Sequence, residues 1–413
     1  MTTPSRDDVS SRRWSLVPAA RAPSSRGTFA ILAGIATALA ASTSACGDDG
    51  AADGTISRFA GNGDAAFTGE AQQALSTSLY WPVDLEFAPD GRPYVLDWQN
   101  HRVRRIDADQ RMRTVFGTDS IGDGPVPGTG DETTAPGVLA TSINLNHPTD
   151  LQFSPDGGTL VLAAWHNHKL RTLDMSTGLA EIVCGRGPGF SGDGAPDATA
   201  LLSMPKSIVL APSGDLFVLD TRNLRVRKIA ADSGIIQTVI GSGMRGFTGD
   251  GGDPRLAQFA FQADSDNPEP GGAIALDGEG RVYIADTENH RIRRADLTLG
   301  TIETIAGNGT AGGGGDGGPA TSAELSHPRD IELAPDGRRL FIADTENHRV
   351  RAVELATGVI ETVAGNGQPG ATGDGGNARA ASLHRPFGIA LDSRGDLFIA
   401  DTLNNVIRKV SRP

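Results

Sequence analysis

Short runs in which apolar and polar residues alternate recur along the chain, and one pattern can be followed through six copies. The clearest copy is LFIADTENHRVR at positions 340–351, and related copies begin at Tyr94, Leu160, Leu216, Val282 and Leu397. Successive copies lie about 58 residues apart. Self-similarity at a fixed period indicates a repeat protein, in which each copy folds as one structural unit.

Each unit contains four short apolar runs, which predict four β-strands. The first run, strand a, follows a Pro in five copies, and a Gly nine residues after this position marks a hairpin turn because Gly tolerates positive φ. Strand b is the LFIAD part of the pattern, strand c is the Arg-containing run after Asn, and strand d follows, as in residues 301–306. The sequence therefore predicts an all-β fold, a six-bladed β-propeller of four-stranded antiparallel blades.

The two ends of the repeat array complement each other. Residues 55–60 match the strand d pattern but precede the first strand a, whereas the last unit ends after its strand c. We expect strand 55–60 to join the C-terminal blade as its outermost strand, because this pairing closes the ring and removes an open edge. The predicted propeller domain is 55–413.

Composition agrees with a loop-rich β protein and limits the partners. The chain has 54 glycines and only 5% aromatic residues, and its 37 Lys and Arg against 50 Asp and Glu give a net charge of −13. An acidic protein is repelled by nucleic acid and by anionic lipid headgroups. We therefore expect neither as the main partner.

The first 45 residues have the pattern of a signal peptide. Five arginines precede an apolar stretch at 29–41, which is too short to span a bilayer. The residues before Cys46 resemble the lipobox of bacterial lipoproteins, although Thr43 stands where that family usually has Leu. This resemblance implies acylation of Cys46 as the mature N-terminus, with 46–54 as a polar tether.

These features predict an exported protein. We expect a cell-envelope or outer-membrane lipoprotein, or otherwise a periplasmic or secreted protein, that contacts the membrane only through the lipid. The export route, Sec or twin-arginine, stays open. A disulfide between Cys46 and Cys184 is disfavoured because it would tie a tail to a strand.

The repeat resembles a known family. The connectors read GNG…GDGG-PA…L-x-x-P, and the second strand ends in AD-T-x-N-H-R-I-R. This pattern resembles the NHL-repeat family, specifically exported bacterial six-bladed NHL propellers, with a repeat style similar to that of teneurins. The resemblance implies the fold, but such folds host binding modules and enzymes alike.

Residues present in every blade are interpreted as structural. The unit contains an invariant Asn, an invariant Arg and, in all blades but the second, an Asp, which Ala164 replaces. Turn hydrogen bonds explain the Asn and the Asp, and the Arg has a carboxylate available in its own or a neighbouring blade. Four turn histidines lie on different blades, far out along each blade, so they do not form a metal site: His101, His168, His290 and His348.

Four connectors contain Gly-Asp-Gly. Their acids are Asp193, Asp250, Asp316 and Asp374. Calcium loops are one interpretation, because Asp supplies hard oxygen ligands. We favour the other, in which the Asp caps one turn of helix and a Pro such as Pro319 starts it.

Positions that differ between blades carry more information about function. Strand a is innermost in a propeller, so residues at its start converge at one mouth of the central channel. The predicted ligand-binding residues are Trp81, Asp84, His147, Asp150, Lys206, His327, Arg329, Asp330 and Arg385. Two long connectors, 117–147 and 241–270, are expected to rise from the same face and partly cover this ring.

The sequence favours a non-catalytic, envelope-anchored binding or scaffold propeller, expected to be a monomer. Its expected ligand is an envelope protein, a glycan or a small polar molecule, bound at the face that carries the connectors between strands d and a. The alternative is a metal-dependent hydrolase or lyase of lactonase type, with Asp84, Asp150 and Asp330 holding Ca or Zn. A third interpretation is a sensor domain that signals through a partner.

One enzymatic resemblance is not followed by the residues. Peptidyl-hydroxyglycine amidating lyases resemble this fold and place a zinc-binding His directly after the first residue of strand a in three blades. In this chain that position never holds His; its residues are Val83, Thr149, Lys206, Gly272, Arg329 and Phe387. The resemblance therefore does not imply that activity here.

Overall fold

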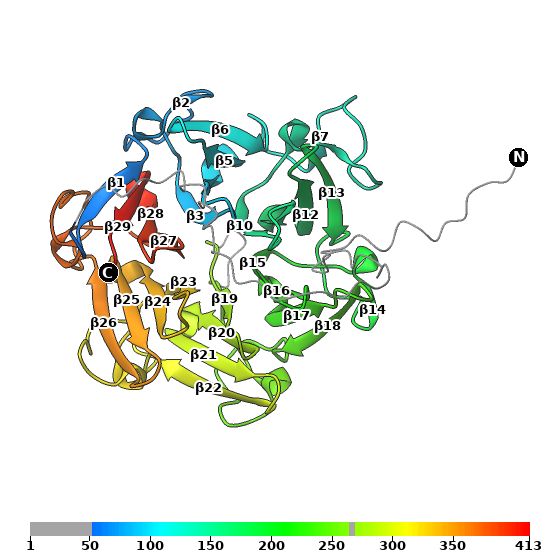
Figure 1. Cartoon of the computed structure of the whole chain (residues 1–413). Helices are drawn as coiled ribbons and strands as arrows, with labels where there is room; N and C mark the ends of the chain where they lie inside the picture. The colour runs from blue at the N-terminus through cyan, green and yellow to red at the C-terminus, as the bar shows by residue number, and fades with distance from the viewer. Residues whose placement is uncertain (1–51, 264–268) are drawn as a thin grey trace, which may run out of the picture.

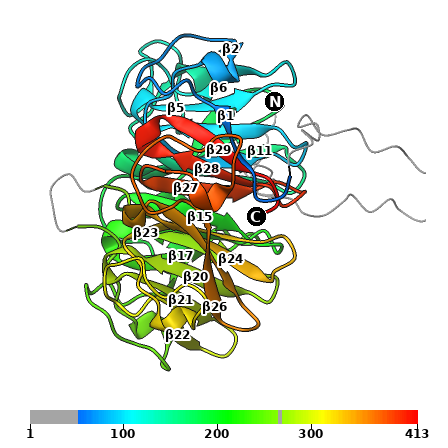
Figure 2. The same ribbon diagram turned by 90° about the vertical axis from the view of Figure 1, so that its left-hand side faces the viewer.

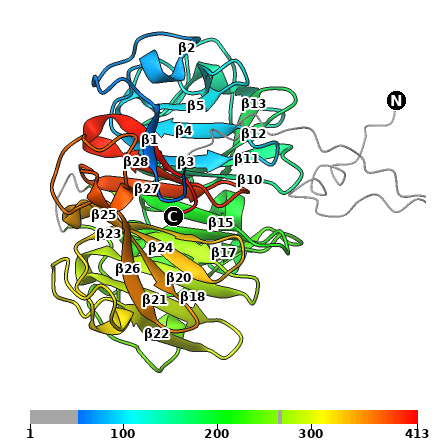
Figure 3. The ribbon, with the colours of Figure 1, turned by 60° about the vertical axis from the view of Figure 1, so that its left-hand side comes forward.

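The computed structural model describes residues 52–263 and 269–413 and confirms the predicted six-bladed β-propeller. Figure 1 shows the six small sheets arranged around a central axis. Figures 2 and 3 show the ring from the side, with the strands running across its thickness. The predicted signal peptide and Cys46 lie outside the described residues and stay predictions.

The strands of each blade are given from the channel outward. Blade 1 contains β3 (Pro82–Phe87), β4 (Pro93–Asp97), β5 (Arg102–Ile106) and β6 (Arg111–Phe116); blade 2 contains β10 (Pro148–Phe153), β11 (Thr159–Ala164), β12 (Lys169–Asp174) and β13 (Leu179–Cys184); blade 3 contains β15 (Pro205–Leu210), β16 (Leu216–Asp220), β17 (Arg225–Ile229) and β18 (Ile235–Ile240).

The second half of the ring follows the same order. Blade 4 contains β19 (Ala273–Leu276), β20 (Arg281–Asp286), β21 (Arg291–Asp296) and β22 (Thr301–Ala306); blade 5 contains β23 (Pro328–Leu333), β24 (Arg339–Asp344), β25 (Arg349–Glu354) and β26 (Val359–Ala364); blade 6 contains β27 (Pro386–Leu391), β28 (Leu397–Asp401), β29 (Val406–Val410) and β1 (Ile56–Ala60).

The ring closes as the sequence predicts. β1 pairs antiparallel with β29, with Ile56 opposite Val410, and so supplies the outermost strand of the last blade. Every blade edge is also covered by a segment of the preceding connector. In blade 6, Ile56 exchanges backbone hydrogen bonds with Gly375 and Gly376. These contacts hold the N-terminal strand from both sides and leave fewer unpaired edge groups.

Short elements in the connectors and turns complete the fold. The connector strands are β2 (Gln72–Gln73), β7 (Gly124–Pro125), β8 (Val138–Leu139), β9 (Ile143–Asn144) and β14 (Ala195–Pro196). The connector 3-10 helices are η1 (Ala74–Ser76), η3 (Ala140–Ser142), η5 (Asp197–Thr199), η7 (Pro254–Leu256), η9 (Ala320–Ser322) and η11 (Ala378–Ala380). Between strands b and c lie η2 (Trp98–Asn100), η4 (Trp165–Asn167), η6 (Thr221–Asn223), η8 (Thr287–Asn289), η10 (Thr345–Asn347) and η12 (Thr402–Asn404). No helix among the described residues is long and apolar enough to cross a membrane.

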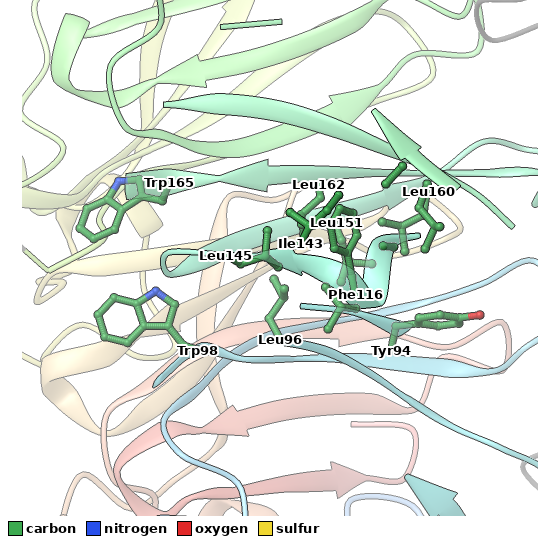
Figure 4. Packing of buried hydrophobic residues seen from close by; sticks show 14 of the residues in the cluster. Tyr94, Leu96, Trp98, Phe116, Ile143, Leu145, Leu151, Leu160, Leu162 and Trp165 are labelled. Carbon is green, nitrogen blue, oxygen red and sulfur yellow. The ribbon is translucent and has the colours of Figure 1, made fainter. Parts of the chain in front are cut away.

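The core lies between neighbouring blades. Strands are apolar on both faces because each sheet packs against two others, and the buried clusters each join residues of two or more adjacent blades. Figure 4 shows Leu96 of blade 1 facing Leu145, Leu151 and Leu162 of the blade 2 unit. This packing makes a rigid support for the residues at the strand ends.

The repeated polar residues form one buried cluster in each blade, which we call the Asp–Asn–Arg cluster. In blade 5, Asp344 accepts hydrogen bonds from the backbone N–H of Ser326 (2.7 Å) and the amide of Asn347 (2.8 Å), and lies 3.7 Å from the Arg351 guanidinium. The Asp and Arg side chains are fully buried. The structural interpretation of these residues is confirmed.

In blade 2, an acid from the long connector takes the place of the missing Asp. Ala164 stands at the Asp position, and Glu132 of the long connector binds Arg171 through two hydrogen bonds of 2.8 and 2.9 Å. The same connector runs along the outer strand, because β8 pairs with β13. The expectation that connector 117–147 partly covers the ring is therefore wrong for the part that pairs with β13.

The Gly-Asp-Gly acids do not cap helices, which corrects the expectation. Asp316 accepts hydrogen bonds from Arg351 (2.6 Å) and from the hydroxyl of Thr362 (2.6 Å). Pro319 is itself the N-cap of η9, and no side-chain cap bond is present there. The connector acid instead completes the surroundings of the buried Arg.

The turn histidines have a structural role, although the sequence pattern predicts a place far out along each blade for them. His290 Nδ1 accepts the backbone N–H of His327 at 3.2 Å, and His348 Nδ1 accepts that of Arg385 at 3.1 Å. These histidines therefore lie at the junction with the next blade, not far out along their own. Each neutral imidazole links two neighbouring blades.

Candidate functional site

The residues that differ between blades at the start of strand a lie on one face of the ring. The antiparallel order places the start of each strand a, the turns between strands b and c and the ends of strands d on the same side. We call this side the connector face and its centre the mouth. The predicted ligand-binding residues divide among two halves of the mouth, a throat and a cavity below it.

Blades 1 and 2 contribute an aromatic–imidazole half to the mouth. Trp81 stacks on Trp98 with ring centroids 6.1 Å apart, and the His147 ring lies 4.3 Å from that of Trp98. His147 Nδ1 and His166 Nδ1 are 2.9 Å apart, so one donates a hydrogen bond and the other accepts it. His166 in turn stacks on Trp165 at 4.0 Å.

Trp98 and Trp165 break the repeat at one turn position. The other four blades have Thr there, and Thr287 and Thr345 donate their hydroxyls to the backbone carbonyls of Pro328 and Pro386 in the next blade. Figure 4 shows the two indole rings one above the other at the same end of their strands. Both indole N–H groups are buried, and neither has a hydrogen-bond partner in the part of the chain that the structure describes.

Blades 4 to 6 contribute an ion-paired half. Glu269, at the end of the second long connector, accepts from Arg329 at 2.8 Å and from Arg385 at 3.0 Å. Glu346 accepts from Arg385 Nε at 2.9 Å, and His327 lies 3.8 Å from Glu288. Of this connector, Glu269 contacts the predicted ring at Arg329 and Arg385; that the connector partly covers the ring stays a prediction.

The first residues after the start of strand a close the throat of the channel. Lys206 donates to the backbone carbonyl of Arg329 at 3.0 Å, and Arg329 donates to that of Pro270 at 2.7 Å. Thr149 donates to the carbonyl of Lys206 at 2.9 Å. Only about 10 Å³ of space remains between these side chains and Val83 and Phe387. A small ligand at the mouth therefore meets a closed floor.

Below the throat, five carboxyl groups line a cavity of about 220 Å³. They are Asp84, Glu86, Asp150, Asp330 and Glu332. Two of them also connect blades: Asp150 accepts the backbone N–H of Ile208 at 2.7 Å, and Asp330 accepts that of Ile389 at 2.8 Å. Gly388 leaves room for Asp84, because a Cβ at Gly388 would lie 2.7 Å from the Asp84 Cα.

Burial makes these carboxyl groups hard to ionise. Desolvation, together with repulsion from Asp150 and Asp330, raises the pKa of Glu86 to about 8. Desolvation raises the pKa of Asp150 to about 7, although the charge of Lys206 opposes the rise. Desolvation by burial also raises the pKa values of Asp84 and Glu332 well above their ordinary range. The cavity therefore holds protons near neutral pH.

The imidazoles of the mouth are shifted in the opposite direction. Burial, together with neighbouring imidazoles, lowers the pKa of His147 to about 3. Burial lowers the pKa of His101 and of His166 to about 4. Loss of hydration explains both shifts, because it disfavours the charged form of the carboxyl groups and of the imidazoles.

The structure separates the predicted residues instead of joining them in one ring. Trp81 and His147 lie in the aromatic half, His327 and Arg385 in the ion-paired half, Lys206 and Arg329 at the throat, and Asp84, Asp150 and Asp330 in the cavity. Within the described part of the chain, no three His, Cys, Asp or Glu side chains are placed to hold a metal ion.

Several residues of the site were not predicted. Trp98, Gln99, Trp165 and His166 lie in the turn between strands b and c, and Glu346 lies in the equivalent turn of blade 5. Their signal was present, because the turn reads DWQN, AWHN, DTRN, DTEN, DTEN and DTLN in the six copies. The second and third residues of this turn differ between the copies, and this difference identifies them as candidates in the same way as at strand a.

Known proteins resemble this chain over much of its length. A family model of the NHL repeat matches residues 272–294, which include β19 and β20. NHL repeat-containing protein 2 of Bos taurus is 28% identical over 295 residues, 65% of this chain and 38% of that protein. Teneurin-1 of Homo sapiens is 27% identical over 399 residues, 86% of this chain and 13% of that protein. The chain thus spans well under two thirds of either relative.

Among solved structures, an auxiliary nutrient binding protein from Bacteroides thetaiotaomicron has a similar fold. The TM-score is 0.61 at 17% identity, covering 86% of this chain and 75% of that chain. At this identity the likeness concerns the fold alone. The chain is a six-bladed β-propeller that carries the NHL repeat.

Proposed function

We propose that this protein is a non-catalytic binding or scaffold propeller that takes its ligand at the mouth of the connector face. One observation carries the proposal. Ten buried side-chain polar atoms lack a hydrogen-bond partner among the described residues, and five belong to residues around the mouth: Trp98, Asn146, Trp165, Gln262 and Arg329. Such groups reduce stability, and a bound ligand or ordered water explains their retention.

The proposed setting is the cell envelope, with Cys46 as the lipid anchor and a protein, glycan or small polar molecule as the ligand. The name of the similar Bacteroides protein, an auxiliary nutrient binding protein, supports a binding role. A metal-dependent hydrolase or lyase is less well supported. Two of its three proposed ligands, Asp150 and Asp330, already accept backbone hydrogen bonds that connect blades.

The proposal is tested by immobilising the full chain and measuring retention of components from an envelope extract. The mouth variant combines Trp81→Ala with Arg385→Ala. The matched control combines Leu299→Ala with Arg338→Ala, both highly exposed side chains in turns of the opposite face. We expect the mouth variant to lose a component that the control retains. Equal retention by both variants, with both folded, would contradict a site at the mouth.

A further inference from the structure

The unpartnered polar atoms at the mouth include both donors and acceptors. The indole N–H groups of Trp98 and Trp165 can only donate, whereas the amide oxygens of Asn146 and Gln262 can only accept. Trp98, Trp165 and Gln262 are at most 6% exposed. These atoms have almost no exposed surface, so a ligand meets them only when the side chains that cover them move. A group that both donates and accepts, such as a hydroxyl, then matches both kinds of atom.

Charge at the mouth does not favour an ionic ligand. Arg329 and Arg385 are already paired with Glu269, and Glu346 adds a second carboxylate for Arg385. A ligand that carried a net charge would have to displace one of these partners or leave its own charge uncompensated. A neutral polar ligand avoids both costs.

The aromatic half supplies a surface for an apolar ring face. Trp81 is partly exposed, Tyr80 is 36% exposed, and their rings meet edge to face at 6.0 Å. A pyranose ring has a C–H face that packs on an indole and hydroxyls around its edge. The polar edge would meet His147, His166 and Gln99, which already contact one another: His147 Nε2 lies 3.4 Å from Gln99 Oε1.

We infer that the part of the ligand that enters the aromatic–imidazole half is a neutral sugar ring, packed on Trp81 with its hydroxyls toward His147, His166 and Gln99. This inference rests on the proposed function and names the ligand class of the same site. The imidazoles of His147 and His166 lie against the rings of Trp98 and Trp165. A sugar that moves these imidazoles therefore changes the surroundings of both indoles.

Tryptophan fluorescence can report this event with unusual selectivity. The chain has four tryptophans, and three of them, Trp81, Trp98 and Trp165, belong to this cluster. In the full chain carrying Trp14→Phe, all emission therefore comes from the site. We would titrate this protein with maltotriose, cellotriose and chitotriose over about 0.01–50 mM.

We expect a saturable change in emission with at least one trisaccharide. Trp81→Ala should weaken that binding at least about tenfold, because the stacking surface is lost. His166→Gln, which keeps a hydrogen-bonding side chain, serves as a second variant if Trp81→Ala folds poorly, and should also weaken binding. Phe190→Ala, an exposed ring in the connector between blades 2 and 3, should leave binding unchanged.

Two results would overturn the inference. The first is no saturable response to any of the three sugars. If the chain still retains an extract component through the mouth, the sugar class fails and the binding function stands; if it does not, both fail. The second is sugar binding that Trp81→Ala and His166→Gln leave intact, which would place the sugar elsewhere.

Discussion

Polar side chains are buried both in the Asp–Asn–Arg clusters and at the mouth. The two regions differ in the partners that these side chains have. In blade 5, Asp344 accepts hydrogen bonds from the backbone N–H of Ser326 and the amide of Asn347. Arg351 of the same blade donates to Asp316.

The Nε atoms of the equivalent Arg104 and Arg408 in blades 1 and 6 lack a hydrogen-bond partner among the described residues. At the mouth, the indole N–H groups of Trp98 and Trp165 have no hydrogen-bond partner within residues 52–263 and 269–413. At the repeated positions, buried ion pairs such as Arg104–Asp97 and Arg408–Asp401 explain the polar side chains even where one guanidinium N–H stays unpaired. Among the described residues, neither an ion pair nor a hydrogen bond explains the indole N–H groups at the differing positions.

The largest expected effect breaks a repeated cluster. Arg351→Leu leaves Asp344 buried without its cation and should lower the free energy of unfolding by about 3–5 kcal/mol. The measurement is urea denaturation, with Arg338→Leu, 78% exposed at its side chain, as the matched control near zero. Equal effects from the two variants would contradict the importance of the buried pair.

The second prediction concerns the one blade that departs from the repeat. Glu132→Ala removes the bidentate partner of Arg171 but leaves Asp123 at 2.8 Å, so the loss should be smaller, about 2–3 kcal/mol. Adding Ala164→Asp restores the acid of the other blades and should recover part of this loss. In the presence of Glu132, the same Ala164→Asp change should destabilise the protein, because it adds a second buried acid.

The repeated positions were predictable from the sequence, and the residue that replaces one of them was not. The fold and ring closure could be predicted because six copies of one pattern and the run at 55–60 leave few alternative arrangements. Glu132 could not be assigned, because nothing in its own stretch shows that it replaces the Asp missing at Ala164. Its partner is 39 residues away in the chain.

The candidate site was predicted only in part. The rule that informative positions differ between blades identified Trp81 and His147, but it was applied to strand a and not to the turns that hold Trp98 and His166. The path of each long connector depends on the residues that it contacts, an outer strand for the first connector and Arg329 for the second. That information lies in three-dimensional contacts such as those of β8 with β13 and of Glu269 with Arg329.

The cavity and the imidazoles should give opposite pH responses. Glu86 has a pKa of about 8 in the folded protein against an ordinary value of 4.5, so the folded state binds its proton more tightly. Its contribution to stability is fully present below pH 4.5 and is lost as pH rises through 8. Glu86→Gln should remove about 1–2 kcal/mol of the decline between pH 5 and 8 in urea titrations, a figure reduced for contact with solvent. An unchanged decline would contradict the raised pKa.

The smallest expected effect lies on the acid side. His166 has a pKa of about 4 in the folded protein, below its ordinary 6.5, so it contributes stability above pH 6.5 that is lost as pH falls toward 4. His166→Gln should reduce that acid loss by about 1 kcal/mol, because other imidazoles of the cluster still titrate. The check is the urea midpoint at pH 7 and pH 4.5; identical acid losses in both proteins would contradict it.

We expect the repeated positions to stabilise the ring and the differing positions to bind the ligand. The most direct measurement compares retention of the extract component by Trp81→Ala and by Arg351→Leu, at a temperature where both are folded. We expect Trp81→Ala to lose retention although its unfolding midpoint falls no further than that of Arg351→Leu, because Trp81 packs against the core but is only partly buried. We expect Arg351→Leu to have a lower midpoint and full retention. Full retention by Trp81→Ala, or loss of retention by folded Arg351→Leu, would contradict it.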